Sequence, residues 1–160
     1  RMVNETEDRS NARMVRETLL QNKAGEATFI PLWRPGLSSR DMITVVTSEL
    51  VPLLPVDVCI AGMGEDCHTA SLFPGALELG RALYPEDDAV LAEVTPPGGL
   101  EPRLSLTGPG LKQSRHRHLL MAGTAKRAAC TRAEATESLK EAPVRILMAG
   151  STPLQVHYAP

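Results

Sequence analysis

The chain has 160 residues, 42% of them hydrophobic, which is enough to bury the core of a single domain over residues 1–160 without disulfide bonds. Its 17 basic and 19 acidic residues nearly balance, which excludes a general electrostatic attraction to nucleic acid or to an anionic membrane. Three cysteines without metal-type spacing, no long apolar run and a charged first decade predict a cytoplasmic protein with reduced thiols and no bound metal.

The first predicted helix covers residues 11–22, where apolar side chains recur at helical spacing. Asp8 or Ser10 is placed to cap its N-terminus. A β-prone run then predicts a short strand over residues 28–32, followed by a loop rich in proline and glycine.

A second helix is predicted over residues 40–50, because apolar residues again recur at helical spacing and Ser38 or Ser39 can cap it. Two prolines end this helix. The β-prone and small residues that follow, 56–61, are typical of a parallel strand covered on both faces.

The second half of the chain continues to alternate between strands and helices. We expect strands over 89–94, 104–106 and 118–122, a short helical piece over 110–114, a helix over 125–140 and an edge strand that carries His157. This alternation predicts an α/β fold with a mostly parallel, layered sheet flanked by helices.

Chemistry-bearing residues gather directly after the strand at 56–61, in the sequence GMGEDCHTASLFPG. Gly62 and Gly64 allow a tight turn and a close approach to a ligand. Asp66 and His68 follow, and in open α/β sheets the groups beyond the carboxyl ends of the strands line the ligand crevice. We therefore expect an active-site loop here.

His68 is the main catalytic candidate, because imidazole can accept a proton from water near neutral pH, although a histidine in a loop is often only a polar residue. Asp66 could orient that imidazole, or it could cap a helix beginning near Thr69. Backbone N–H groups at Gly62 and Gly64 could cradle a phosphate or stabilise an oxyanion.

Three further features carry charge. Lys126 lies where a strand gives way to a helix and could reach a phosphate, or it could simply be solvated. Arg103 is a candidate for the rim of the site, against the alternative of a solvated charge at the start of a strand. The basic run 115–118 has too few aromatic neighbours for nucleic-acid binding and is interpreted as the solvated start of a strand.

The loop sequence resembles the signature GxGxDGHTASLFPG of the 6-phosphogluconolactonases, which share a superfamily with amino-sugar phosphate isomerases and deaminases. DRSNARMVRETLL, PRLSLTGPGL, MAGTAKR and PLQVHYAP resemble further elements of that family in the same order. The resemblance covers essentially the whole chain.

The resemblance implies a Rossmann-like sheet and a hydrolase of the oxidative pentose phosphate pathway. Such an enzyme converts 6-phospho-D-glucono-1,5-lactone into 6-phospho-D-gluconate without a cofactor. It implies that His68 acts as general base and acid with Asp66 as its partner, and that Lys126 and Arg1 bind the substrate's phosphate.

The chain departs from the family pattern in two places. Cys67 stands where the family has glycine, and the family's first strand and its GGSTP phosphate loop are absent. Two alternatives therefore remain: an amino-sugar phosphate isomerase or deaminase, although these typically read HIAFNEP in this loop, and a non-catalytic sugar-phosphate-binding remnant.

Overall fold

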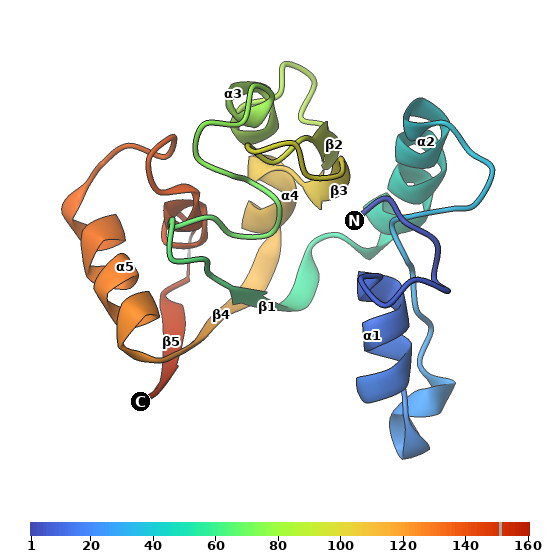
Figure 1. The fold of residues 1–160 in the computed structure, drawn as a ribbon, viewed down its shortest axis with the longest axis horizontal. Coiled ribbons are helices and arrows are strands. Elements are labelled where there is room, and N and C mark those ends of the chain that lie inside the picture. The colour runs from blue at the N-terminus through green and yellow to red at the C-terminus, as the bar shows by residue number, and fades with distance from the viewer. Residues whose placement is uncertain (151) are drawn as a thin grey trace.

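Two small sheets organise the protein, whose computed structural model describes residues 1–150 and 152–160. The larger sheet is parallel, with its three strands in the order β1 (Val56–Gly62), β4 (Ser114–Ala122) and β5 (Leu154–Ala159). The smaller is an antiparallel pair of β2 (Leu91–Val94) and β3 (Arg103–Leu106) (Figure 1). The predicted α/β class is confirmed.

The register of the parallel sheet brings the three strand ends together. Gly62 at the end of β1 lies opposite Leu120 of β4, and Leu120 lies opposite His157 of β5. The carboxyl ends of all three strands therefore meet at one edge, where α/β proteins place their ligands. The strand β5 is an edge strand, as predicted for the segment with His157.

Helices and 3₁₀ segments connect the strands. They are α1 (Asn11–Thr18), η1 (Asn22–Glu26), α2 (Ser39–Leu50), η2 (Val51–Leu53), α3 (Leu79–Leu83), α4 (Gly108–Lys112), α5 (Thr124–Ala135) and η3 (Pro143–Leu147). Ser10 caps α1 and Ser38 caps α2, each by accepting a hydrogen bond from a backbone N–H of the first turn. None of these helices is both long enough and apolar enough to cross a membrane, in the part of the chain that the structure describes.

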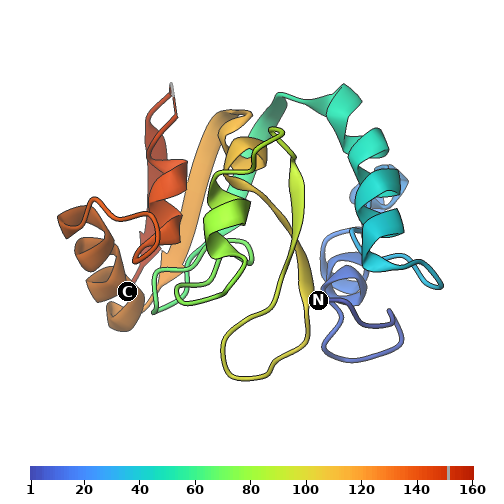
Figure 2. The same cartoon turned by 90° about the horizontal axis from the view of Figure 1, so that it is seen from above.

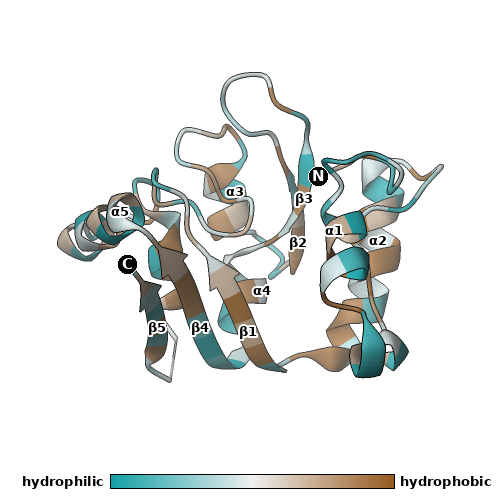
Figure 3. Ribbon diagram, turned by 60° about the horizontal axis from the view of Figure 1, so that its bottom comes forward, coloured by the Kyte–Doolittle hydropathy of each residue, from teal (hydrophilic) through white to brown (hydrophobic). Residues whose placement is uncertain are grey.

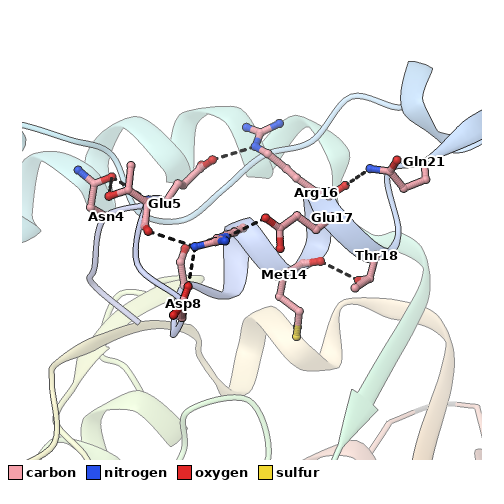
Figure 4. A network of polar contacts seen from close by, with 11 residues as sticks. Asn4, Glu5, Asp8, Met14, Arg16, Glu17, Thr18 and Gln21 are labelled. Atoms are coloured by element: carbon pink, nitrogen blue, oxygen red, sulfur yellow. Dashed lines mark hydrogen bonds and ion pairs between the residues drawn. The ribbon is translucent and has the colours of Figure 1, made fainter.

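Helix α1 lies on the surface, and none of its residues is buried. Polar contacts hold it in place. Arg13 pairs with Asp8 at 2.7 Å and with Glu17 at 2.8 Å. Arg16 pairs with Glu5 at 2.9 Å (Figure 4). Exposed ion pairs contribute little individually. Together they fix the path of the N-terminal segment across this helix.

The main hydrophobic core lies between the parallel sheet and the elements α3, α5 and η3. Leu119 of β4, Ala129 of α5 and Ile146 of η3 are fully buried there. A second cluster joins α2 to the small sheet through Val46 and Leu91. The core therefore holds α5 and the elements around it against one face of the parallel sheet.

The expectation that the strand at 56–61 is covered on both faces is wrong. Val58 is 52% exposed and Ile60 is 67% exposed on β1, and Leu120, opposite Gly62 on β4, is 48% exposed. Figure 2 shows α3 and η3 on one side of the parallel strands, and Figure 3 shows that β1 is apolar along most of its length. The other face of the sheet is open.

Three local predictions also need correction. Residues 28–31 have no regular secondary structure, and no other described strand pairs with them. The helix predicted over 125–140 ends at Ala135, since Thr136 has extended backbone angles. Arg117, expected among solvated charges, is only 1% exposed and donates a hydrogen bond to the carbonyl oxygen of Thr152.

Candidate active site

The loop after β1 folds back on itself at the carboxyl edge of the sheet. The N–H of Gly64 donates to the carbonyl oxygen of His68 at 3.0 Å, and the N–H of Cys67 donates to that of Gly64 at 3.0 Å. The hydroxyl of Thr69 donates to the carbonyl oxygen of Gly62 at 2.9 Å, which ties the loop to the end of β1. These bonds hold the loop in a single compact turn.

Asp66 orients the imidazole of His68. Its Oδ1 lies 2.6 Å from Nδ1 of His68 and also accepts the backbone N–H of His68 at 3.2 Å. The alternative of a helix cap is wrong, because between β1 and α3 the described residues form no helix, and Thr69 instead forms an isolated bridge with Leu72. The contact with Asp66 uses Nδ1 of His68 and does not involve Nε2. The side chain of His68 is 29% exposed.

Electrostatics keep Asp66 ionised. Partial burial of the carboxyl group opposes its ionisation, but the hydrogen bonds from the ring and backbone of His68 outweigh it and hold the pKa of Asp66 below its ordinary value. A carboxylate in this position fixes the tautomer of the imidazole and stabilises its protonated form. The geometry is that of a histidine prepared to accept a proton.

Gly64 makes room for this pair. A Cβ built on Gly64 would collide with Nδ1 of His68 and with Oδ1 of Asp66. Because the N–H of Gly64 is already bonded to His68, it is engaged within the loop and is not free to cradle a phosphate. Gly62 contributes its carbonyl oxygen to Thr69, as described above.

Cys67 occupies the position where the signature has glycine. Its φ is +67°, in the left-handed region that glycine adopts without a steric penalty. The side chain is buried, with Sγ 3.3 Å from the carbonyl oxygen of Ala129, and the carbonyl oxygen of Cys67 accepts the N–H of Val144 at 3.0 Å. The loop thus keeps the backbone geometry of a glycine at this residue.

Arg1 and Arg103 form a pair of neighbouring cations. The N–H of Met2 donates to the carbonyl oxygen of Pro102 at 3.1 Å, which places the first residue beside the start of β3. Burial, followed by the charge of Arg1, lowers the pKa of Arg103, and burial followed by the charge of Arg103 lowers the pKa of the Arg1 amino group. The buried Nε of Arg103 has no hydrogen-bond partner among the described residues. Two cations with an unused donor favour an anionic ligand.

Phe73, a residue that the sequence did not single out, connects the two parts of the site. Its ring centroid lies 4.4 Å from that of His68, and Cζ of Arg103 lies 4.9 Å from it over the ring. The contact brings Arg103, predicted only as a rim candidate, within one side chain of His68. The signal in the sequence was the phenylalanine five positions after His68, but its contacts depend on the fold.

Helix α5 supplies the remaining candidates. Lys126 is half-buried in its first turn, directly after β4, and so lies at the same sheet edge as the loop of His68. Arg132, which carried no signal in the sequence, donates from Nη2 to the carbonyl oxygen of Glu65 at 2.6 Å. One helix thus carries a candidate phosphate ligand and a hydrogen bond to the loop that holds His68.

A cavity of about 210 Å³ has Arg1, Ser71 and Leu104 in its wall, and Arg1 is the one predicted site residue that lines it. A larger one, of about 960 Å³, lies between α2 and β2 and includes none of the predicted site residues. The smaller cavity fits the chemistry better, because it contains one of the two cations. Among the described residues, no three His, Cys, Asp or Glu side chains are grouped to hold a metal ion.

Comparisons with known proteins agree with one family. The family model for glucosamine-6-phosphate isomerases/6-phosphogluconolactonase matches residues 1–156. The chain is 35% identical to a 6-phosphogluconolactonase of Rhizobium meliloti over all of its own length and 70% of the relative's, and 35% identical to one of Pseudomonas aeruginosa over 67% of the relative's length. The crystal structure of a 6-phosphogluconolactonase from Shewanella baltica matches with a TM-score of 0.92 and 31% identity, over 100% of this chain and 69% of that one.

Proposed function

This chain belongs to the family of glucosamine-6-phosphate isomerases and 6-phosphogluconolactonases, and on that premise we propose that it hydrolyses 6-phospho-D-glucono-1,5-lactone to 6-phospho-D-gluconate. The observation that carries the proposal is the His68–Asp66 pair, linked through Phe73 to a cation with a free donor. Its relatives at 35% identity favour the lactonase over the isomerase or deaminase reaction.

The geometry supports the following sequence of proton transfers. Because Nδ1 of His68 faces Asp66, Nε2 is left to take a proton from a water molecule that attacks the lactone carbonyl. The tetrahedral intermediate then expels the ring oxygen, and the imidazolium returns the proton to it, which opens the ring. Asp66 stabilises the imidazolium between the two steps.

Arg1, Arg103 and Lys126 are the proposed ligands of the substrate's phosphate. Arginine binds phosphate through two parallel N–H donors, and Nε of Arg103 is such an unused donor. Gly64 serves in this proposal as the space for the catalytic pair, and Gly62 as the backbone that anchors the loop. The proposed reaction needs only water and the lactone, with no cofactor.

We propose that residues 1–160 form one lactonase domain of the oxidative pentose phosphate pathway, which acts in the cytoplasm on a small phosphorylated lactone. Three free cysteines support a reducing compartment.

The test is the rate of hydrolysis of freshly generated 6-phospho-D-glucono-1,5-lactone above its spontaneous rate. We expect His68→Ala to lose at least about 100-fold in kcat, the typical contribution of a general base. A matched control is His116→Ala, because His116 is an exposed histidine of β4 outside the loop. We expect it to retain full activity.

Two further substrates separate the alternatives. Unphosphorylated glucono-1,5-lactone should be hydrolysed far more slowly if the arginines bind phosphate. Turnover of glucosamine 6-phosphate would favour the isomerase or deaminase, and a folded chain that accelerates neither reaction would establish the remnant.

A further inference from the structure

Phe73 touches both halves of the candidate site, the proton acceptor and the anion-binding cation. The ring planes of His68 and Phe73 are tilted by 40°, with their centroids 4.4 Å apart. The guanidinium carbon of Arg103 lies over the same phenyl ring at 4.9 Å, within the range of a cation–π interaction.

The phenyl ring is itself held rigidly. Phe73 is only 7% exposed and belongs to the main hydrophobic core. Its carbonyl oxygen accepts the N–H of Ala76 at 3.1 Å, and the preceding residue, Leu72, is fully buried and bonded back to Thr69 at 2.9 Å. A rigid ring transmits its position to the side chains packed on it.

Neither contact uses a polar atom that the reaction needs. A phenyl ring offers no hydrogen-bonding atom to Nε2 of His68, and it contacts Arg103 through its π-face, so that neither contact takes up an N–H donor of the guanidinium. Among the described residues no carboxylate pairs with Arg103. An ion pair would fix the arginine equally well, but it would compete with a phosphate for the same donors.

We propose that Phe73 is a positioning and specificity-determining residue that sets the separation between the proton acceptor His68 and the phosphate ligand Arg103. This rests on the lactonase function proposed above. A lactone whose carbonyl and phosphate are spaced as in 6-phospho-D-glucono-1,5-lactone then meets both groups at once, whereas one without the phosphate meets only His68.

The test compares Phe73→Leu, which keeps an apolar side chain but removes the aromatic ring, with Phe73→Tyr, which keeps the ring. We expect Phe73→Leu to raise KM for the phosphorylated lactone and to lower kcat, with a loss in kcat/KM of about tenfold or more, because both ring contacts disappear. Phe73→Tyr should stay within about twofold of the wild type.

Ile146→Val is the matched control for packing in the same hydrophobic core. Ile146 is fully buried in that core but lies in η3, outside the loop of His68 and Phe73, so its truncation weakens the core without removing a ring. It should leave KM unchanged. A KM in Phe73→Leu equal to the wild-type value, or an equal loss in Phe73→Tyr or Ile146→Val, would overturn the proposal.

Binding of 6-phospho-D-gluconate, measured by calorimetry, keeps the two proposals separate. If the wild-type chain shows no turnover, the lactonase function fails, and binding alone then tests Phe73. Weaker binding in Phe73→Leu with wild-type binding in Phe73→Tyr would support its role in placing Arg103. Equal binding in all three proteins would refute it.

Discussion

Cys67 combines a strained backbone with a well-packed side chain. A φ of +67° costs a residue with a Cβ about 1–2 kcal/mol relative to glycine. The thiol offsets part of this cost, because it is buried and lies 3.3 Å from the carbonyl oxygen of Ala129. The chain therefore tolerates a cysteine where its family signature has glycine.

Replacing Cys67 should separate these two effects. Cys67→Ala keeps the strained Cβ and loses the sulfur, so we expect a loss of about 1 kcal/mol in the free energy of unfolding. Cys67→Gly also loses the sulfur but relieves the strain, against an entropic cost of about 0.5–1 kcal/mol for glycine, so it should be at least as stable as the alanine variant. Urea denaturation of both variants gives the comparison. A glycine variant clearly less stable than the alanine variant would show that no strain is stored at this residue.

For single residues, the sequence indicates candidates for the chemistry more readily than the residues that hold those candidates in place. His68 and Asp66 were candidates because two side chains of suitable chemistry, two residues apart, follow a strand, and the structure brings them to 2.6 Å. Phe73 and Arg132 were not, because their roles depend on contacts with residues outside the local pattern. Arg117 was expected in solvent because its burial depends on the later segment with Thr152.

At the scale of elements, α5 and the catalytic loop form a unit. Arg132 in α5 donates at 2.6 Å to the carbonyl oxygen of Glu65, the residue directly before Asp66. Movement of α5 would therefore shift the loop that holds His68.

Arg132→Met should weaken this link while keeping an unbranched side chain on the helix. We expect a fall in kcat of several-fold, up to about tenfold, since a charged hydrogen bond at a partly exposed site contributes about 1 kcal/mol. Steady-state kinetics measure the fall, and Thr131→Ala on the neighbouring exposed position of α5 is the control. If both variants keep the wild-type kcat, the contact does not position the loop.

Secondary structure was predictable from the sequence where the interactions that stabilise it lie within the same segment. The helix expected over 40–50 is present as α2, because its serine cap and helical spacing are both properties of the segment itself. The strand expected over 28–32 is absent, because a strand also needs a neighbour, which propensity cannot supply. Helix α5 is shorter than predicted, since Thr136 accepts the N–H of Ser138 at 3.2 Å and so competes with helical hydrogen bonding.

At the scale of the whole molecule, the parallel sheet has one covered face and one open face. Val58, Ile60 and Leu120 are exposed on the open face, although sheets of this kind are almost always covered on both. The apolar run of β1 indicates a strand that prefers burial on both faces, but it does not say what covers them. The α/β class was therefore predictable and the layering was not.

The open face should make the 160-residue chain bind a hydrophobic dye and associate with itself. We expect Ile60→Thr combined with Leu120→Thr to reduce both, because threonine keeps a β-branched side chain while removing apolar surface. Dye fluorescence and size-exclusion chromatography measure the effect. Leu77→Thr is the control, since Leu77 is 98% exposed in a loop outside this face. An equal reduction in the control, or none in the double variant, would contradict the role of this face.

The order of the strands also determines when the catalytic loop acquires its shape. Val56 must find Ser114 before β1 has a neighbour, and the carbonyl oxygen of Cys67 receives its hydrogen bond from Val144. Contacts between residues so distant in the sequence form slowly, because a long loop must close, at a cost in conformational entropy, before the contact contributes favourable free energy. On a ribosome, the segment with His68 leaves the exit tunnel long before Val144 does. The loop that holds His68 therefore lacks its hydrogen bond from Val144 while residues 69 to 144 are added to the nascent chain.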